Sequence, residues 1–597
     1  MVPLLAIGDG AGRSDVLVYG GTPGGIAAAL AAADDGESVV LVEPTARIGG
    51  LTTSGLSHTD FRTFEGLNGP FLDFARRVEA DYVARYGRES PQARDCFRGT
   101  FGEPSVNLAA FRAMLDEHPR IHLATGARLE GLAMADGGRR IASATLARPD
   151  GSTWTVAADA FIDATYEGDL MAKVGVASRV GRESRDEYGE FLAPDVADGQ
   201  LQAYNFRLIM TQDPANRVMP EAPAGYRRDD FAPVLDWLQG RGIRTVFGYP
   251  TGCLFKAQTP PLPNGKYDIN DVSKGSIRLS LPGRNLGWPD GSPAERGRIF
   301  AEHLRDQVGL LYFLQNDDAV PAAFRDEARG WGWCRDEFEE TGHLPPQLYV
   351  REARRMVGAR VYTQKDVEPA PGDARAVLHT DAIAIGDYGL NCHGTAHEGP
   401  RFGGQHSGEF YRSTPPYQIP YGVIVPKEVD NLLVPVAASA SHVGFCALRL
   451  EPIWMSLGRA AGHAAHLARS EKIAAGSVPV GRLQRRLHRA GSATIYVSDV
   501  PREDPEFAIV QAFGTAGGLH GLSGPPRGSI RGKNIHGQYY EAFPAHAADL
   551  GRPLDAPLAE RWTAIARTLG LPTDGLPQPD GRATRRDWLR AAARNLR

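Results

Sequence analysis

A glycine-rich turn between two apolar runs constrains the fold of this chain more than any other feature. The apolar run Val16–Tyr19 leads into the turn Gly20–Gly25, an alanine-rich stretch that favours a helix, and a second apolar run that ends at Glu43. Glycines let a backbone turn sharply and approach a pyrophosphate at a helix N-terminus, and an acid in this position accepts hydrogen bonds from a ribose. The pattern therefore predicts a strand–helix–strand unit that binds a dinucleotide.

The turn departs from the usual pattern G-x-G-x-x-G at one position. Thr22 occupies the place of the middle glycine, and its side chain is expected to narrow the approach to the pyrophosphate. The flanking strands, the helix and the acid still favour a dinucleotide site over an ordinary turn with a surface acid. The residues expected to contact the dinucleotide in this unit are Gly20, Gly21, Thr22, Pro23, Gly24, Gly25 and Glu43.

The segment after Glu43 favours FAD over NAD. A nicotinamide domain would normally continue with another helix, but here the chain stays small and polar and contains a second glycine pair, as a loop along a long extended cofactor would. This stretch resembles the FAD-binding segment of the glutathione-reductase-like flavoproteins. It resembles more closely a large family of bacterial FAD-dependent oxidoreductases related to the fumarate reductase flavoproteins. The resemblance implies FAD contacts at Pro44, Arg47, Gly49, Gly50, Leu51, Thr52, Ser54 and Gly55.

Two later segments extend this resemblance. The run Phe161–Leu170 is similar to the family's strand and turn near the adenine end, and Asn431–His442 resembles its last sheet strand and flavin loop. In the family, the helix that corresponds to Arg449–Gly462 directs its N-terminus at the pyrimidine end of the flavin, where it stabilises the negative charge of the reduced ring. The acid usual in the last strand motif is missing, so backbone amides or Ser439 would replace it. The contacts implied here are Ala127, Arg128, Ala164, Thr165, Ala438, Ser439, His442, Glu451, Pro452 and Met455.

These motifs predict an α/β protein whose cofactor domain is discontinuous along the chain. A Rossmann-like FAD-binding domain is expected at residues 1–180 and 423–475, with an inserted α+β substrate domain at residues 181–422. Residues 476–597 are expected to form a helical C-terminal region that acts as a lid or a packing appendage.

Local patterns predict individual elements. Helices are expected at Phe71–Arg85, Ser292–Asn316 and Tyr349–Gly358. The stretches Ile121–Ala127 and Ala142–Val156 are expected to be strands of a small antiparallel layer beside the main sheet.

Composition and charge exclude several classes of function. The chain carries 66 lysines and arginines against 71 aspartates and glutamates, a net charge of −5, so it has no basic excess for binding nucleic acid. No stretch reaches the roughly 18 apolar residues of a membrane span, and the N-terminal run Met1–Asp9 lacks the features of a signal peptide. A cytoplasmic protein without a nucleic-acid partner is therefore expected.

The five cysteines are far apart in the sequence and show no C-x-x-C spacing. This argues against a disulfide scaffold, a zinc site and a dithiol redox pair. We therefore expect no metal site, and buried thiols at Cys96, Cys253, Cys334, Cys392 and Cys446.

A flavin carries out hydride transfer itself, so the protein has to supply position and a base. The densest group of suitable side chains lies in Asn391–Arg401, where His393 and His397 occur in a glycine-rich stretch. A histidine suits general-base catalysis near neutral pH. A metal site of these histidines with Glu398 is disfavoured, because the glycines oppose the helix that such sites use.

Three further side chains are candidates for contact with flavin or substrate. His442 lies just before the helix expected to face the flavin, and His58 lies just beyond the second glycine motif, where it could contact the flavin or carry it covalently. Arg354 belongs to an arginine-rich stretch in which one guanidinium could clamp a carboxylate or a sugar hydroxyl. An internal ion-pair network is the alternative for these arginines.

We therefore expect an FAD-dependent oxidoreductase that transfers a hydride from a polar small molecule, a secondary alcohol or sugar-like compound, to flavin with a histidine as base. Two alternatives stay open. One is a C–C dehydrogenase or reductase of the fumarate-reductase kind, with an arginine as proton donor, and the other is a flavin-dependent lyase or isomerase. The expected partners are a small-molecule substrate and an electron acceptor of unspecified kind, and the sequence does not specify an oligomeric state.

Overall fold

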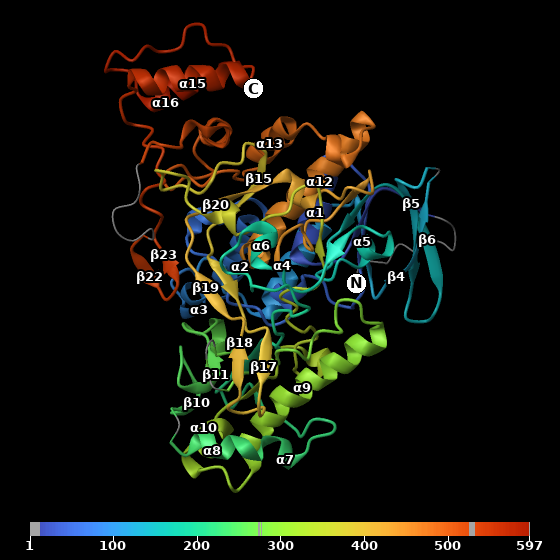
Figure 1. The fold of residues 1–597 in the computed structure, drawn as a ribbon. Helices are drawn as coiled ribbons and strands as arrows, with labels where there is room; N and C mark the ends of the chain where they lie inside the picture. Colours follow the sequence, from blue (N-terminus) through green and yellow to red (C-terminus); the bar gives the residue numbers. More distant parts are fainter. Residues whose placement is uncertain are drawn as a thin grey trace.

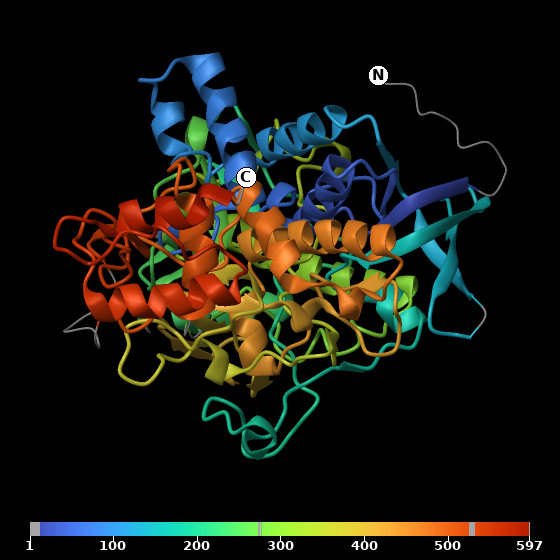
Figure 2. The same cartoon turned by 90° about the horizontal axis from the view of Figure 1, so that it is seen from above.

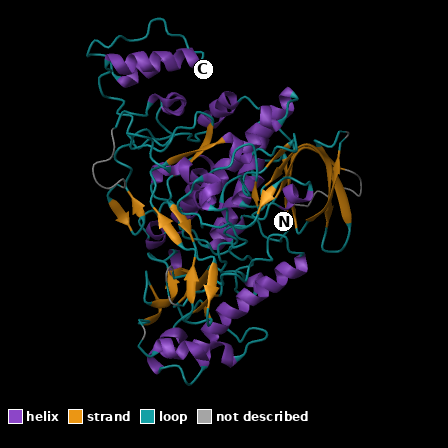
Figure 3. Cartoon of the chain, in the orientation of Figure 1, coloured by secondary structure: helices purple, strands orange, loops and turns teal. Residues whose placement is uncertain are grey.

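The computed structural model describes residues 12–595, apart from positions 136, 241, 273, 274, 276 and 524–531. The N-terminal run Met1–Asp9, in which no signal peptide is expected, lies outside the described residues. The chain forms a mixed α/β structure with two main sheets, and long loops connect its helices and strands (Figure 3). Within the described residues, no helix combines the length and the apolar character that a membrane crossing requires.

The larger sheet is built around five parallel strands: β1 (Gly12–Tyr19), β2 (Val39–Glu43), β3 (Ile121–Thr125), β6 (Thr153–Asp163) and β21 (Leu432–Leu433). Helix α1 (Pro23–Asp34) connects β1 to β2, which confirms the predicted strand–helix–strand unit. The antiparallel strands β4 (Arg128–Met134) and β5 (Ile141–Ala147) extend the sheet beyond β6. The strand order is β3-β2-β1-β6-β5-β4, with β21 paired to β6.

One strand lies in a different part of this sheet from the one predicted. The prediction that Ile121–Ala127 joins the antiparallel layer is wrong, because β3 is the parallel edge strand next to β2. Helix α4 (Pro104–Asp116) precedes β3, and a helical crossover of this kind allows parallel pairing. The other stretch expected in that layer, Ala142–Val156, does lie there, in the antiparallel pair of β5 and β6.

Helix α12 (Glu451–Glu471), the long orange helix across the middle of Figure 2, packs on α1. The two backbones approach each other at very short range. A Cβ atom on Gly458 would lie 2.0 Å from the carbonyl oxygen of Gly24. Only glycine allows two helix backbones to approach this closely. A Cβ atom on Gly24 would in turn lie 3.1 Å from the carbonyl oxygen of Trp454, so the first turn of α12 lies beside the glycine turn after β1.

The smaller sheet lies at the lower end of the molecule in Figure 1. Its strands are β8 (Leu208–Thr211), β9 (Arg217–Val218), β10 (Thr245–Gly248), β11 (Cys253–Ala257), β12 (Lys266–Asn270) and β13 (Gly332–Cys334). Their order is β10-β11-β12-β8-β13-β9. Helix α9 (Pro293–Asn316) lies near this sheet, followed by α10 (Ala322–Arg329), and it confirms the helix expected at Ser292–Asn316.

The other two helix predictions have opposite outcomes. Helix α2 (Gly69–Tyr86) confirms the helix expected at Phe71–Arg85. The helix expected at Tyr349–Gly358 is wrong, because this backbone is extended and its residues Arg355–Met356 form β14, which pairs with β7 (Ser178–Arg179). The arginines of this stretch are held by partners on several distant segments, and such tertiary contacts override a local helix preference.

Three two-stranded ladders form an arm that runs from the helices toward the smaller sheet (Figure 1). They are β15–β20 (Ala382–Gly386 and Tyr417–Pro420), β16–β19 (Leu390–Cys392 and Phe410–Arg412) and β17–β18 (Ala396–Glu398 and Gln405–Ser407). Helix α11 (His442–Leu448) packs against β16. Short helices elsewhere are α3 (Pro91–Asp95), α5 (Asp169–Lys173), α6 (Arg185–Tyr188), α7 (Arg228–Phe231), α8 (Leu235–Leu238) and α13 (Val480–Arg489).

The C-terminal region has a hydrophobic core of its own around Trp562 and Trp588. Its helices are α14 (Phe507–Phe513), α15 (Ala556–Thr568) and α16 (Arg585–Ala592). Besides these helices the chain forms a hairpin, β22 (Asn534–His536) and β23 (Tyr539–Tyr540), which the prediction of a helical region did not include. The hairpin lies beside β19 and well apart from α15 in Figure 1.

Candidate functional site

A channel of about 520 Å³ lies at the carboxyl ends of β1 and β2. Helix α1 begins at the wall of this channel, so its N-terminal amides and the positive end of its dipole are available to a pyrophosphate. The predicted contact residues that line the channel are Gly20, Thr22, Glu43, Pro44, Gly50, Arg128 and Thr165.

The Thr22 hydroxyl is used within the protein. It donates to the carbonyl oxygen of Ala164 (2.8 Å) and accepts a hydrogen bond from the amide of Gly25 (3.1 Å). Thr22 is therefore the N-cap of α1 and ties the glycine turn to the end of β6. The side chain expected to narrow the approach to the pyrophosphate thus stabilises the turn itself.

Glu43 combines backbone contacts with free acceptor positions. One carboxylate oxygen accepts a hydrogen bond from the amide of Gly21 (2.8 Å), and the other accepts one from the amide of Thr45 (2.8 Å). An ionised carboxylate has about four acceptor positions, so Glu43 can also accept hydrogen bonds from ribose hydroxyls. Burial raises the pKa of Glu43 to about 7, and the two amides oppose that rise.

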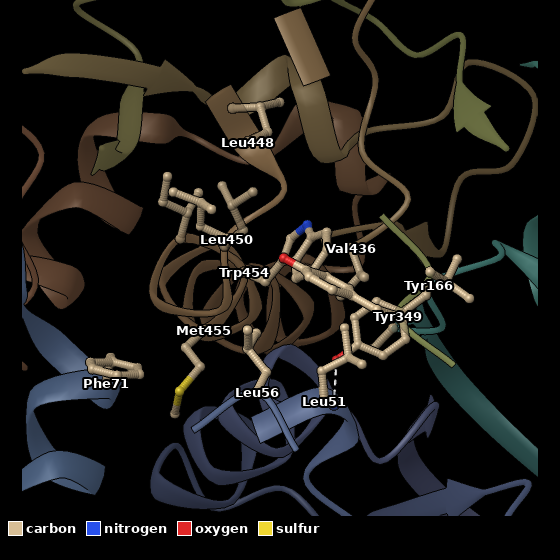
Figure 4. Close-up of a cluster of buried hydrophobic side chains, with 14 of the residues drawn as sticks. Leu51, Leu56, Phe71, Tyr166, Tyr349, Val436, Leu448, Leu450, Trp454 and Met455 are labelled. Carbon is tan, nitrogen blue, oxygen red and sulfur yellow. Dashed lines mark hydrogen bonds between the residues drawn. The ribbon is translucent and has the colours of Figure 1, made fainter. Parts of the chain in front are cut away.

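A second, narrow cavity lies at the N-terminus of α12. Glu451, the first residue of the helix, lines it together with Pro452 and Thr52, and all three are predicted flavin contacts. Glu451 accepts a hydrogen bond from the Tyr166 hydroxyl (2.6 Å). That hydroxyl in turn accepts one from the amide of Leu51 (3.1 Å; Figure 4).

The other carboxyl oxygen of Glu451 is buried and has no hydrogen-bond partner among the described residues. Burial raises the pKa of Glu451 to about 8, so the group is protonated at neutral pH. A protonated carboxyl can both donate and accept hydrogen bonds, and the pyrimidine edge of a flavin offers partners for both. An orphaned polar atom at the start of this helix is what a bound flavin ring would satisfy, so the residues present fit the cofactor.

Apolar side chains contribute to the lining of the narrow cavity, and Figure 4 draws several members of the hydrophobic cluster to which they belong, among them Leu56 and Trp454. Leu56 and Trp454 line the cavity, while the predicted contacts Leu51 and Met455 are buried members of the same hydrophobic cluster and lie behind the lining. Apolar walls with a few polar groups are typical of cofactor sites.

A third cavity, of about 260 Å³, shares Asp60 and Tyr349 with the narrow one. We call it the substrate cavity. Its wall is assembled from the loop around residue 60, the smaller sheet, the strand ladders and the C-terminal hairpin β22–β23. Most of its lining side chains are polar, among them His58, Arg62, Lys256, Tyr388, His393 and Gln538.

His393 is the predicted base that lies in the substrate cavity. Its Nδ1 atom is buried and has no hydrogen-bond partner among the described residues. Burial lowers the pKa of His393 well below the usual histidine value, and nearby cations, first Arg351 and then Arg449, lower it further. His393 is therefore neutral near pH 7, which is the state that a general base needs.

The structure places His397 outside the three cavities. It lies on β17, where its Nε2 atom is 3.0 Å from the carbonyl oxygen of Pro400 and its ring centroid is 4.6 Å from that of His406. His58, by contrast, lines the substrate cavity and stacks on Phe101 with 4.0 Å between ring centroids. Burial lowers the pKa of His58 to about 3.

His442 is buried behind β16 and lines none of the three cavities. Its Nδ1 atom is 2.9 Å from a carboxylate oxygen of Glu352, which raises the pKa of His442 against the effect of burial. Its Nε2 atom is 3.4 Å from Sγ of Cys392, and the ligand atoms of Cys392, His442 and Cys446 all lie within 4.8 Å of one another. The fold thus brings together two cysteines that the sequence separates, as buried free thiols.

Arg354 lines the channel rather than the substrate cavity. It pairs with Asp169 (3.1 Å) and Asp290 (2.8 Å). Arg355 is fully buried and pairs with Glu352 (3.0 Å), so the internal ion-pair network describes these arginines better than a substrate clamp does.

The remaining predicted contacts lie around the channel without lining it. Arg47 donates to the carbonyl oxygen of Thr53 (2.8 Å) and pairs with Glu340 (2.7 Å). The Ser439 hydroxyl accepts a hydrogen bond from the amide of Gly358 (2.9 Å), so one of its acceptor positions is used in packing. The others are all buried and line none of the three cavities: Gly21, Pro23, Gly24, Gly25, Gly49, Ser54, Gly55, Ala127, Ala164 and Ala438.

Sequence reasoning missed the contribution of the C-terminal hairpin to the substrate cavity. Gln538 donates from its amide nitrogen to Asp60 Oδ1 (3.0 Å), and the Tyr539 hydroxyl donates to the carbonyl oxygen of Thr59 (2.9 Å). His536 lines the cavity as well. The short polar and aromatic run around Gly537 is compatible with a hairpin turn. Nothing in that run indicates contact with Asp60, more than four hundred positions earlier in the chain.

The chain matches the family model described as FAD dependent oxidoreductase over residues 15–487, and no curated protein matches it. Among solved structures it is similar to p-nitrophenol 4-monooxygenase PnpA from Pseudomonas putida DLL-E4, with 13% identity, 59% of this chain and 70% of that chain covered, and a TM-score of 0.25. It is also similar to glycerol-3-phosphate dehydrogenase from Bacillus halodurans complexed with FAD, with 13% identity, 28% and 37% covered, and a TM-score of 0.19.

A third similar structure is L-proline dehydrogenase from P. horikoshii, with 15% identity, 26% of this chain and 23% of that chain covered, and a TM-score of 0.17. The matches thus span less than half the length of the two dehydrogenases. The family match is far more extensive, because it contains the glycine turn, Glu43, the whole of α12 and most of the substrate cavity. The chain therefore belongs to the family of FAD-dependent oxidoreductases, and it is an enzyme whose cofactor is FAD.

Proposed function

We propose that this oxidoreductase removes a hydride from a carbon that carries a hydroxyl group, in a polar small molecule of the secondary-alcohol or sugar-like kind, and that His393 takes the hydroxyl proton. The observation that carries the proposal is the state of His393. It is a neutral imidazole with an unpartnered nitrogen, on the wall of a polar cavity that adjoins the N-terminus of α12. Such a group can accept a proton at neutral pH.

Each end of the site has a separate task in this proposal. The α1 N-terminus and Glu43 hold the pyrophosphate and the ribose, and Glu451 holds the polar edge of the ring. When bound, FAD supplies the two-electron acceptor for the hydride. The cations around His393 keep it deprotonated until the substrate arrives. Residues 181–422 and 476–597 enclose most of the substrate, together with the loop that carries His58 and Arg62, while residues 1–180 and 423–475 hold most of the cofactor.

A C–C dehydrogenase or reductase is the second candidate. Arg62 favours it, because its guanidinium lies on the cavity wall where a proton donor to a carbon would be needed. The two candidates differ in the bond that is oxidised, a carbon–oxygen bond in the first and a carbon–carbon bond in the second. A panel of substrates therefore separates them.

Anaerobic mixing of the holoenzyme with alcohols, sugars and saturated dicarboxylates, followed by bleaching of the flavin absorbance, tests the proposal. An alcohol or sugar-like compound is expected to bleach the flavin. His393→Ala should keep FAD bound and slow bleaching by about 10²–10⁴-fold, the usual contribution of a general base. His397→Ala is the matched control and should bleach at the wild-type rate, because His397 lies outside the cavity.

The pH dependence gives a second readout. Because burial and the neighbouring cations lower the pKa of His393, the rate of bleaching at low substrate concentration should stay constant through neutral pH and fall only in acid, below the usual histidine pKa of about 6.5. Equal rates and equal pH profiles in the wild type and His393→Ala would show that the base is another residue.

A further inference from the structure

Lys256 is a cation on the wall of the substrate cavity without a matching anion. It lies on β11, and none of the described residues forms a salt bridge or a hydrogen bond with its ammonium group. Burial lowers the pKa of Lys256 and Arg207 adds to this effect, while Asp271 and Asp60 oppose it from beyond ion-pair distance. An ammonium group removed from water without a partner is unfavourable, so a bound anion would stabilise it.

Arg62 is a second cation on the same wall, and it is buried. One of its guanidinium nitrogens donates to the carbonyl oxygen of Gln538 (3.1 Å), and the group lies over the ring of Tyr388, 4.6 Å from its centroid. Asp387 accepts a hydrogen bond from the backbone amide of Arg62, but no described carboxylate forms a salt bridge with the guanidinium. These contacts fix the orientation of the group and leave donors for a ligand.

Other charges of the cavity wall are already matched. Arg207 forms a bidentate pair with Asp268, with nitrogen–oxygen distances of 2.7 and 2.5 Å. Glu409 pairs with Arg278, which lies behind the wall. Asp60 stays on the wall as an acid, so the unpaired cations exceed the acids that face the cavity.

We propose that the substrate is an anion, a hydroxy compound that bears a carboxylate, and that Lys256 and Arg62 bind this carboxylate. The hydroxyl part of the inference rests on the proposed function, whereas the anion site rests on the charges alone. In the reaction the carbon loses a hydride to FAD and the hydroxyl loses its proton to His393. The product is then an oxo acid, and bound FAD would supply the acceptor for the two electrons of the hydride.

Lys256 also connects substrate binding to the base. Lys256 is one of the groups that lower the pKa of His393. A carboxylate bound to Lys256 offsets that positive charge and raises the pKa of His393 toward its usual value, because an opposite charge favours the protonated imidazole. A neutral alcohol of the same shape brings no such compensation, so the cavity favours a hydroxy acid in the proton-transfer step as well as in binding.

Binding can be tested without turnover. The oxidised holoenzyme is titrated with malonate, with the neutral matched compound malonamide and with inorganic phosphate, and the flavin absorbance spectrum reports binding. Malonate is expected to bind at least about tenfold more tightly than malonamide, as a charge-assisted contact implies. Equal affinities, or binding of phosphate in place of malonate, would overturn the carboxylate assignment.

Variants then assign the site. Lys256→Met keeps the length of the side chain, and it should weaken malonate binding by about 10- to 100-fold without changing malonamide binding. Arg62→Gln should also weaken malonate binding. Lys427→Met is the matched control, because Lys427 is exposed and remote from the cavity lining, and it should bind malonate like the wild type. The flavin content of each variant shows that it is folded, and wild-type malonate affinity in both cavity variants would overturn the proposal.

The two proposals fail in different ways. If malonate binds through Lys256 but no hydroxy acid bleaches the flavin, the anion site holds and the proposed function fails. If neutral alcohols bleach the flavin as fast as the corresponding hydroxy acids, the proposed function holds and the anionic substrate is excluded. The pH profile of the bleaching rate gives an apparent pKa. If this pKa is higher at saturating hydroxy acid than at low hydroxy acid concentration, the result supports the connection between substrate charge and His393.

Discussion

The pyrophosphate end of the channel and the substrate cavity are built from the chain in different ways. Gly20, Glu43 and Gly50 come from one short stretch, and a single strand–turn–helix–strand unit sets their relative positions. The substrate cavity takes His58, His393 and Gln538 from three regions that only tertiary packing brings together. A local pattern is therefore enough to recognise the cofactor end, whereas the substrate end exists only in the folded chain.

The two regions also differ in the kind of group whose pKa is shifted by burial. In the channel and the narrow cavity, burial raises the pKa values of Glu43 and Glu451. In the substrate cavity, burial lowers the pKa values of His393 and Lys256. Both shifts disfavour the charged form, so burial acts mainly on acids at the cofactor end and on bases at the substrate end.

The largest effect is expected at Glu451, where the two regions meet. Its pKa in the folded protein, about 8, lies above the unfolded value, so the folded state binds more protons than the unfolded state between about pH 4.5 and pH 8. The free energy of unfolding of the apoprotein therefore falls as pH rises through this window. Glu451→Gln removes the ionisation and should reduce that loss by up to about 4 kcal/mol, measured by urea unfolding at about pH 5 and pH 9.

Glu89→Gln serves as the control, because Glu89 is exposed. The free energy of unfolding of Glu89→Gln should fall as pH rises by the same amount as that of the wild type. If Glu451→Gln follows the same curve, the carboxyl is not buried in the state that unfolds, and the contrast between acids at one end and bases at the other is lost.

A smaller effect is expected at Glu43. Glu43→Ala removes a ribose acceptor and the acceptor for two amides, so the dissociation constant of FAD should rise by about 10- to 100-fold, equivalent to about 1.5–3 kcal/mol. Fluorescence of released FAD measures it. The affinity for malonate in the FAD-saturated variant should stay at the wild-type value. If the variant loses affinity for malonate as well as for FAD, the two regions are not independent.

The smallest effect is expected at Gln538. Gln538→Ala removes the hydrogen bond to Asp60, and the apparent KM for the substrate should rise several-fold, equivalent to about 1 kcal/mol. FAD affinity should not change, because Gln538 lines only the substrate cavity. A change in FAD affinity with an unchanged KM would assign the hairpin to the cofactor end.

Local sequence patterns predicted the parts of the molecule in which neighbours in the chain are neighbours in space. The unit from β1 to β2 and helices α2 and α9 depend on apolar periodicity and caps within a short stretch, and each was predicted from it. The helix start at Glu451 and Pro452 was expected from the resemblance of Arg449–Gly462 to a helix of the family, and α12 does begin there.

Predictions failed where a distant partner decides the conformation. The stretch Tyr349–Gly358 has a helical pattern, but β14 pairs with a strand more than 170 residues earlier in the chain, so the backbone is extended. His442 was expected at the flavin because of its position before α12, yet Glu352 holds it on the other side of β16. The unpaired charge of Lys256 could not be seen in the sequence at all, because it depends on which acids the fold leaves out of reach.

The position of the C-terminal hairpin has a consequence for how the protein is made. The channel and the narrow cavity are complete once α12 has been synthesised, whereas the wall of the substrate cavity still lacks Gln538 and Tyr539 at that stage. Chains grow from the N-terminus at about 5–20 residues per second, and domains fold as they emerge. A nascent or truncated chain that ends after α12 would thus possess a cofactor site whose substrate side is still open.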